Sequence, residues 1–107
     1  MGSATVLVHG RPAGTLTEIV RNRSYRFSYA EDYHGPLVSL TLPLRPELYE
    51  FDRFPPFFDG LLPEGAQLEA LLRLGKIDRD DPMRQLLAVG RDLVGAVTVV
   101  ALDEGST

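Results

Sequence analysis

Apolar and polar positions alternate with a period of two through much of the first 45 residues. In residues 24–30, Tyr25, Phe27 and Tyr29 fall on one side of the chain and polar residues fall on the other. Residues 37–44 repeat this alternation. Such a pattern is typical of an antiparallel strand with one face on a core and the other face in water. It predicts a strand in each of these two segments.

Three further apolar runs indicate additional strands. Residues 6–8 are rich in β-branched side chains, and residues 15–20 resume the run after a turn marked by Gly10 and Pro12. Runs bounded by glycine and proline in this way are typical of strands joined by hairpins. The four segments before residue 45, which are residues 6–8, 15–20, 24–30 and 37–44, therefore predict an antiparallel meander. The β-branched run at residues 94–102 predicts a fifth strand that returns to the same sheet.

The apolar spacing changes to three or four residues in the segment 65–75. Leu68, Leu71 and Leu72 share this helical spacing, and Gly75 suits a left-handed C-terminal cap. These features predict a helix, although the glycines and the proline just before it leave its first residue open.

A second helix is better defined at both ends. Asp81 is a natural N-cap, Pro82 fits the first turn, and Gly90 marks the end. Between them, Met83 and Leu86 share one apolar face.

These elements predict one α+β domain over residues 1–107. It contains a small antiparallel sheet of about five strands, with two short helices after the first four strands. Residues 103–107 are expected to form a frayed tail. The side chains expected in the core lie on the apolar faces of the predicted elements, and they are Tyr25, Phe27, Val38, Leu40, Leu71, Leu86 and Val97.

The composition narrows the class of protein. A chain of 107 residues with 44% hydrophobic and 24% charged residues is long enough for one modest globular core. Its net charge of −4 argues against a protein that binds nucleic acid by itself, because phosphate contacts need a local excess of Lys and Arg. The chain has no cysteine, no basic-then-apolar leader and no apolar run approaching the ~18 residues of a membrane span. We therefore expect a soluble, cytoplasmic protein that contacts neither nucleic acid nor membrane.

Candidate chemistry is sparse. His9 and His34 are interpreted as structural, because neither has the partner residues of a metal site. Asp59 and Glu64 could form an acid/base pair, but such a pair needs a closed pocket that a domain of this size rarely builds. The charged run at residues 78–82 could attract a cation, although a solvated linker ending in an N-cap is favoured. With no nucleophile elbow and no phosphate-binding glycine loop, the sequence predicts no enzyme and no catalytic, cofactor-binding or metal-binding residue.

Five motifs occur in the order in which they stand in the N-terminal subdomain of HipA-type Ser/Thr kinase toxins, which the chain resembles. The motifs are GTLTEI, YRFSYAEDY, LVSLTLPL, FFDGLLPEG and LLAVGRDLVGAVTVV. The most specific stretches are residues 57–63 and 90–97, and the resemblance covers nearly the whole chain. In such toxins a much larger kinase domain follows this subdomain, whereas the present sequence stops shortly after its last predicted strand.

The resemblance implies a partner. In split systems resembling HipBST, the N-terminal part is a separate short protein, HipS, which binds the kinase HipT and acts as its antitoxin, while HipB is the DNA-binding member. The chain resembles these HipS-like antitoxins. A HipT-like Ser/Thr kinase toxin is therefore the expected partner, with a HipB-like protein in a larger complex. The alternative is an N-terminal structural or assembly subdomain excised from a longer HipA-like kinase toxin.

The motif FFDGLLPEG is the expected contact with such a partner. Leu61 and Leu62 lie in a turn stiffened by glycine and proline, where they either close the core or dock on a neighbour. We expect docking, because a preformed loop loses little conformational entropy on binding. The residues expected to contact the partner are Asp59, Gly60, Leu61, Leu62, Pro63, Glu64, Gly65, Ala66 and Gln67.

Four further residues are secondary candidates for this contact. Phe57 and Phe58 either pack under the sheet, singly or together, or join the docking surface. Arg91 and Asp92 either pair with each other in a turn or pair with the partner, and the structural role is favoured.

Overall fold

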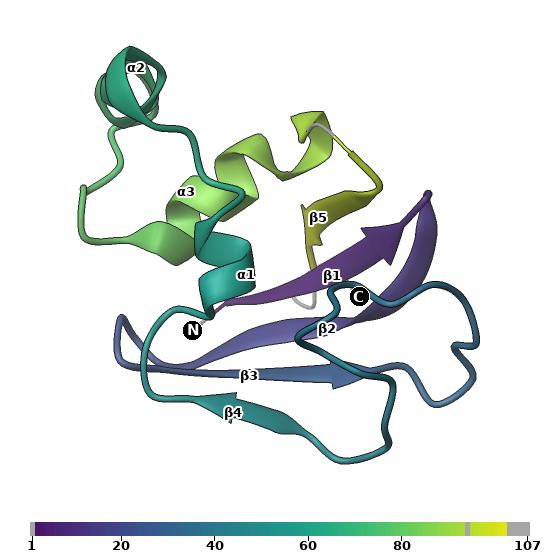
Figure 1. Ribbon diagram of the computed structural model, residues 1–107. Coiled ribbons are helices and arrows are strands. Elements are labelled where there is room, and N and C mark those ends of the chain that lie inside the picture. Colours follow the sequence, from purple (N-terminus) through teal and green to yellow (C-terminus); the bar gives the residue numbers. More distant parts are fainter. Residues whose placement is uncertain (1, 94, 103–107) are drawn as a thin grey trace.

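The computed structural model of the protein describes residues 2–93 and 95–102. Five strands form one antiparallel sheet in the order β4-β3-β2-β1-β5 (Figure 1). The strands are β1 (Ser3–Val8), β2 (Arg11–Val20), β3 (Ser24–Tyr29), β4 (Tyr49–Phe51) and β5 (Val97–Ala101). The predicted α+β class and the five-stranded antiparallel sheet are confirmed. The tail predicted for residues 103–107 lies outside the described residues.

Tight turns and a closing contact set the register of the sheet. His9 and Gly10 join β1 to β2 with φ angles of 50° and 80°. Positive φ at both positions of a two-residue turn matches the twist of the flanking strands. At the other side of β1, β5 pairs with it in antiparallel register, and the N–H of Leu102 donates to the carbonyl oxygen of Ser3 at 2.9 Å. The first and last strands are therefore neighbours, and both described ends of the chain meet.

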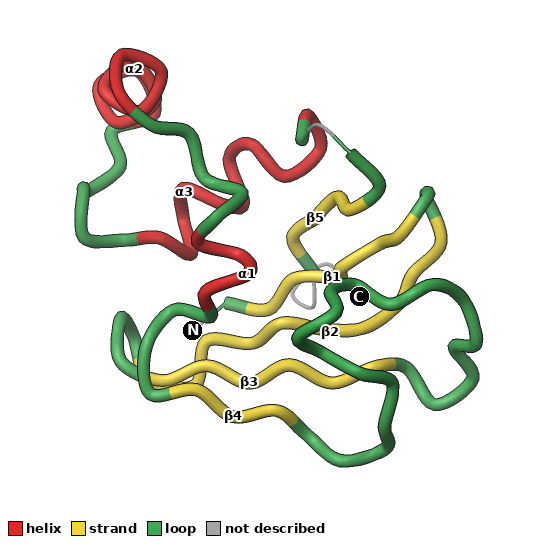
Figure 2. The backbone as a smooth tube through the Cα atoms, in the orientation of Figure 1, coloured by secondary structure: helices red, strands yellow, loops and turns green. Residues whose placement is uncertain are grey.

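In the described residues, three short α-helices and one 3₁₀ turn lie between β4 and β5 in the chain. They are α1 (Pro56–Asp59), α2 (Gly65–Gly75), α3 (Pro82–Val89) and η1 (Gly90–Asp92). The two predicted helices correspond to α2 and α3, whereas α1 was not predicted. Its first residue is a proline, which is tolerated in a first turn because that N–H has no intrahelical partner. The helices lie on one side of the sheet, with α2 farthest from it (Figures 1 and 2).

The helix ends differ from the predictions in detail. Gly75 is the last residue of α2, and the left-handed cap is Lys76, with φ of 54°. A Cβ at Gly75 would touch the end of the Ile77 side chain, which folds back over this position. Gly90 stands at the C-cap position of α3 with right-handed backbone, so the winding continues into η1.

The core lies between the sheet and the helices. The predicted core residues Tyr25, Phe27, Val38, Leu86 and Val97 are buried. Two predictions were wrong. Leu71 is only half-buried, because α2 stands apart from the sheet and buries none of its residues completely.

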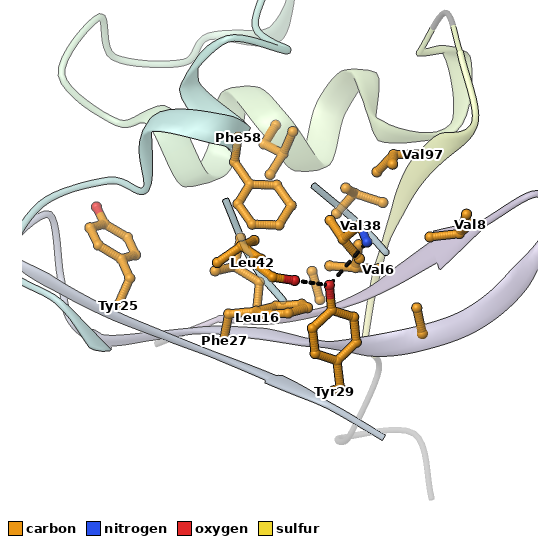
Figure 3. Close-up of a cluster of buried hydrophobic side chains, with 14 of the residues drawn as sticks. Val6, Val8, Leu16, Tyr25, Phe27, Tyr29, Val38, Leu42, Phe58 and Val97 are labelled. Carbon is orange, nitrogen blue, oxygen red and sulfur yellow. Dashed lines mark hydrogen bonds between the residues drawn. The ribbon is translucent and has the colours of Figure 1, made fainter. Parts of the chain in front are cut away.

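Leu40 is the second error, with 90% of its surface exposed. Residues 37–44 do not form a strand, and the fourth strand is instead β4. The N–H of Leu42 donates to the carbonyl oxygen of Ser39 at 3.0 Å, which closes a tight turn with Leu40 at its tip. Val38 and Leu42 flank this turn and both enter the core (Figure 3). The alternation of side chains is real, but the chain reverses within it.

One buried phenol holds this turn on the sheet. The Tyr29 hydroxyl accepts from the N–H of Val38 at 3.0 Å and donates to the carbonyl oxygen of Leu42 (Figure 3). The Tyr29→Phe variant should lose about 1–3 kcal/mol of unfolding free energy, because both backbone groups are left without a buried partner. Denaturant titration measures the loss. Tyr49→Phe is the control, since that hydroxyl bonds to Pro43 at an exposed site. Equal losses in the two variants would contradict the role given to Tyr29.

Burial raises the pKa of the Tyr29 phenol above its ordinary value of 10.0, and burial followed by the nearby charges of Glu18 and Asp81 raises the pKa of Tyr25. Both phenols therefore stay protonated in the folded state at a pH where they ionise in the unfolded chain. Their contribution to stability is complete below pH 10 and is lost as the pH rises through the higher folded values. The melting temperature should fall above about pH 10, and less steeply in Tyr29→Phe. A flat profile in both proteins would contradict this.

Candidate functional site

The predicted contact loop forms a ridge between α1 and α2. Asp59 ends α1, and residues 60–64, which we call the connecting segment, lead to Gly65 at the start of α2. The N–H groups of Leu61 and Leu62 donate to the carbonyl oxygens of Phe58 and Asp59 at 3.1 and 3.2 Å. These bonds continue the turns of α1, so the connecting segment is shaped by its own backbone. Gly65 has φ of 60°, a conformation that favours glycine.

The phenylalanine pair anchors this ridge to the core. Phe58 is completely buried and packs against Phe27, with ring centroids 6.0 Å apart. Phe57 is half-buried and meets Phe58 edge to face at 5.2 Å. One member of the pair therefore lies in the core and the other lies partly at the surface. The connecting segment thus starts from a fixed point.

Two buried carboxylates, Asp81 and Glu18, pair with arginines at the surface and hold α3 beside the ridge. The Asp81 side chain accepts from the N–H of Arg84 at 3.2 Å, which confirms Asp81 as the N-cap. The guanidinium of Arg21 lies 3.4 Å from Asp81. Arg84 also lies 3.7 Å from the buried carboxylate of Glu18 on β2. The charged run at residues 78–82 thus serves to cap and orient α3, and no group of three potential metal ligands occurs among the described residues.

Two grooves run along the connecting segment, one on each side. The η1 groove lies toward the end of α3 and has a volume of about 570 Å³. Its lining consists of Gly60, Leu61, Leu62, Pro63, Glu64, Gln67, Val89, Asp92 and Leu93. The predicted loop and the secondary candidate Asp92 are therefore brought to one surface.

The α3 groove lies on the other side and has a volume of about 580 Å³. Gly60, Leu62, Pro63 and Glu64 line both grooves, so this part of the connecting segment separates them. Its charged lining residues carry both signs, and they are Arg53, Asp59, Glu64, Arg79 and Asp80.

The connecting segment leads into α2, which projects from the body of the protein (Figures 1 and 2). None of its residues is buried, and Leu74 is 80% exposed. Glu69 on this helix pairs with Arg79 at 2.7 Å, which ties α2 to the chain that follows it. Ala66 and Gln67 are exposed in its first turn.

The structure places most of the predicted contact residues in two groups that differ in burial. Leu61, Leu62 and Pro63 are half-buried in the groove walls, whereas Asp59, Glu64 and Gln67 are exposed at their rims. Arg91 is exposed, lines neither groove and forms no ion pair with Asp92. The sequence did not reveal Val89 and Leu93, because only the fold brings the end of α3 to the loop.

The site consists of two grooves that share apolar residues of the connecting segment and have charged side chains around them. This arrangement suits the docking of another protein, in which apolar side chains enter grooves and a polar rim surrounds them. Within the described residues, no helix has the length and apolar character needed to cross a bilayer.

Comparisons with known proteins point to one family. Residues 4–100 match the family described as HipA N-terminal domain. A solved structure, "N-terminal domain of HipA toxin", aligns with a TM-score of 0.77 and 31% identity over 97% of this chain and 95% of that chain. An uncharacterized protein of Haemophilus influenzae is 34% identical over 91% of this chain and 90% of its own length. Y4dM of Sinorhizobium fredii, named as a candidate kinase, is 35% identical over 92% of this chain but only 27% of its own length.

Proposed function

Because the chain belongs to the HipA N-terminal domain family, we propose that it is a non-catalytic antitoxin that binds and neutralises a separately encoded, HipA-like Ser/Thr kinase toxin. Its family places it in a HipA-related toxin–antitoxin context. The observation that carries the proposal is that the match is to the N-terminal domain of HipA and not to the kinase domain. On this proposal the chain acts on the kinase by contact, and the ridge with its two grooves supplies the contact surface.

The Haemophilus influenzae relative supports a role in trans. This domain makes up 90% of that protein, so a chain consisting almost wholly of this domain exists elsewhere. We propose a HipT-like kinase as the direct partner, with the connecting segment and the first turn of α2 at the contact. A HipB-like DNA-binding protein would join a larger complex through the kinase, without direct contact between this chain and DNA.

The alternative function is that of a structural or assembly subdomain of a longer HipA-like kinase. Y4dM favours it, because the matched region there is 27% of a protein named as a candidate kinase. The two functions predict opposite effects on kinase activity. An antitoxin lowers the activity when it is added, whereas a subdomain that completes the fold of the kinase raises it.

The deciding experiment combines the purified chain with a HipA-like kinase from the same genome. The two proteins should co-purify, and substrate phosphorylation should fall as this chain is added to the kinase. Activity that rises on addition would favour the assembly role, and failure to co-purify would refute both functions for this pair.

The isolated chain is expected to bind no ATP and to transfer no phosphate. The expectation follows from the match to the non-kinase part of HipA and from the lack of a phosphate-binding glycine loop in the sequence. Isothermal titration with MgATP should give no binding heat, and radiolabelled ATP should label neither the chain nor a generic protein substrate. Micromolar ATP affinity in the pure protein would contradict a purely non-catalytic role.

A further inference from the structure

The charged side chains that line the η1 groove are all acidic. Five of its nine lining residues are apolar and half-buried, namely Leu61, Leu62, Pro63, Val89 and Leu93. Its charged lining residues are Glu64 and Asp92, which are both acidic and both exposed. Neither carboxylate forms an ion pair with any residue in the described part of the chain.

We propose that the η1 groove binds a segment of the partner protein in which apolar side chains are flanked by arginine or lysine. The inference rests on the proposed function, since the neutralised protein supplies this segment. An apolar side chain would replace water against Leu61, Val89 and Leu93. A flanking cation would then reach Glu64 or Asp92, where an acidic or neutral segment would leave the carboxylates without a counter-charge.

Charge distinguishes this groove from the one beside it. The α3 groove carries Arg53 and Arg79 beside its carboxylates, so a cationic segment there would also meet like charges, whereas the η1 groove has no basic lining residue. The whole chain has a net charge of −4, which attracts basic segments from a distance but does not choose where they dock. The combination of apolar walls with acidic rims is what selects the η1 groove.

The walls are preformed, which favours a short segment as the occupant. Phe58 fixes one wall in the core, and α3 with η1 forms the other. A Cβ at Gly90 would collide with the carbonyl oxygen of Val99, so η1 lies directly on β5. Because the walls are preformed, little conformational entropy of the domain is lost on binding. A contact of only a few side chains therefore does not have to offset a large ordering cost.

Peptide probes test the groove without the kinase. The first probe is a synthetic peptide with two leucines flanked by arginines, the second replaces its arginines with glutamate, and the third replaces its leucines with serine. Nuclear magnetic resonance should show that the first peptide shifts the signals of Leu61, Val89 and Leu93. The other two should leave these signals in place. Equal shifts with the serine peptide, or shifts confined to residues outside the groove, would overturn the proposal.

A pair of charge-matched variants adds a second readout. In Glu64→Lys/Asp92→Lys both rim charges are reversed, while Glu31→Lys/Glu47→Lys makes the same change in net charge at exposed residues outside the groove. The rim variant should bind the first peptide about tenfold more weakly, with a flatter dependence on salt, because two contacts change sign. The matched control should keep the affinity within about twofold, apart from a general salt-dependent loss. Equal weakening in both variants would show that net charge alone attracts the peptide.

The outcomes separate this inference from the proposed function. If the chain neutralises the kinase and the rim variant does so equally well, the groove proposal fails and the antitoxin function stands. If the peptide binds in the groove but the chain neither binds nor neutralises the kinase, the antitoxin function fails and the groove stands as a binding site for basic, apolar segments.

Discussion

Replacing Leu86 with alanine should lower the free energy of unfolding by about 2–5 kcal/mol, whereas Leu40→Ala should change it by less than about 0.5 kcal/mol. The two substitutions remove the same atoms. Leu86 is fully buried under the sheet, so its truncation leaves a cavity, while Leu40 is 90% exposed at the tip of its turn. For a domain of this size, the Leu86 variant should melt roughly 10 °C or more below the wild type. Thermal and denaturant unfolding of both variants measures the contrast.

The contrast also tests the fold itself. A strand over residues 37–44 would place Leu40 in the core beside Val38, and then Leu40→Ala would cost as much as Leu86→Ala. Equal losses would therefore show that the turn around Leu40 is wrong. A small loss at Leu86 would show instead that α3 presents another face to the sheet.

Leu62→Ser should weaken binding to the kinase about thirtyfold and abolish neutralisation at the wild-type dose. Leu62 lies between the two grooves and lines both, so an apolar group of the partner in either groove would contact it. Loss of one interfacial anchor typically costs about 2 kcal/mol, which corresponds to this change in affinity. Glu64→Arg should also weaken binding, because it reverses a charge at the rim. Titration of the labelled kinase measures both affinities.

Two controls keep this result interpretable. Circular dichroism must show that each variant is folded, because Leu62 is half-buried. Leu74→Ser makes the same chemical change on α2, where the side chain is 80% exposed and lines neither groove. If the Leu74 variant loses binding and the folded Leu62 variant does not, the outer side of α2 is the contact and the ridge is not. Wild-type neutralisation by all variants would leave Asp92 or a sheet edge as the remaining candidates.

The sequence predicted the sheet where local chemistry decides the structure. Strands β1, β2, β3 and β5 follow from runs of alternating or β-branched residues, and Gly10 marks the first turn, whereas Pro12, predicted in the same turn, lies inside β2. It failed at residues 37–44, where alternation continues through a reversal that the buried hydroxyl of Tyr29 stabilises. A period of two cannot show a turn whose hydrogen-bond partner lies nine or more residues away in the chain. The short helix α1 was missed because a Pro-Pro pair is also typical of an irregular loop.

The candidate site was predictable only as a segment. Glycine and proline in FFDGLLPEG indicated a shaped loop, and the structure shows backbone hydrogen bonds that shape it. The grooves could not be predicted, since Val89 and Leu93 reach the loop only after α3 is positioned by Asp81 and Glu18. Helical spacing likewise placed Leu71 on an apolar face but did not show that α2 stands apart from the sheet.

The hydrogen bond between Leu102 and Ser3 makes the described chain nearly a closed ring. When the two ends of a chain lie close together, the chain can be circularly permuted: the ends are joined and new ends are opened elsewhere, while the strands keep their places in the sheet. A short linker could join the two ends, and new ends could be opened in the exposed stretch at residues 45–48, away from the connecting segment. This permuted chain would keep the ridge and both grooves while offering a different point of attachment. A partner or reporter fused there would leave the proposed contact surface uncovered.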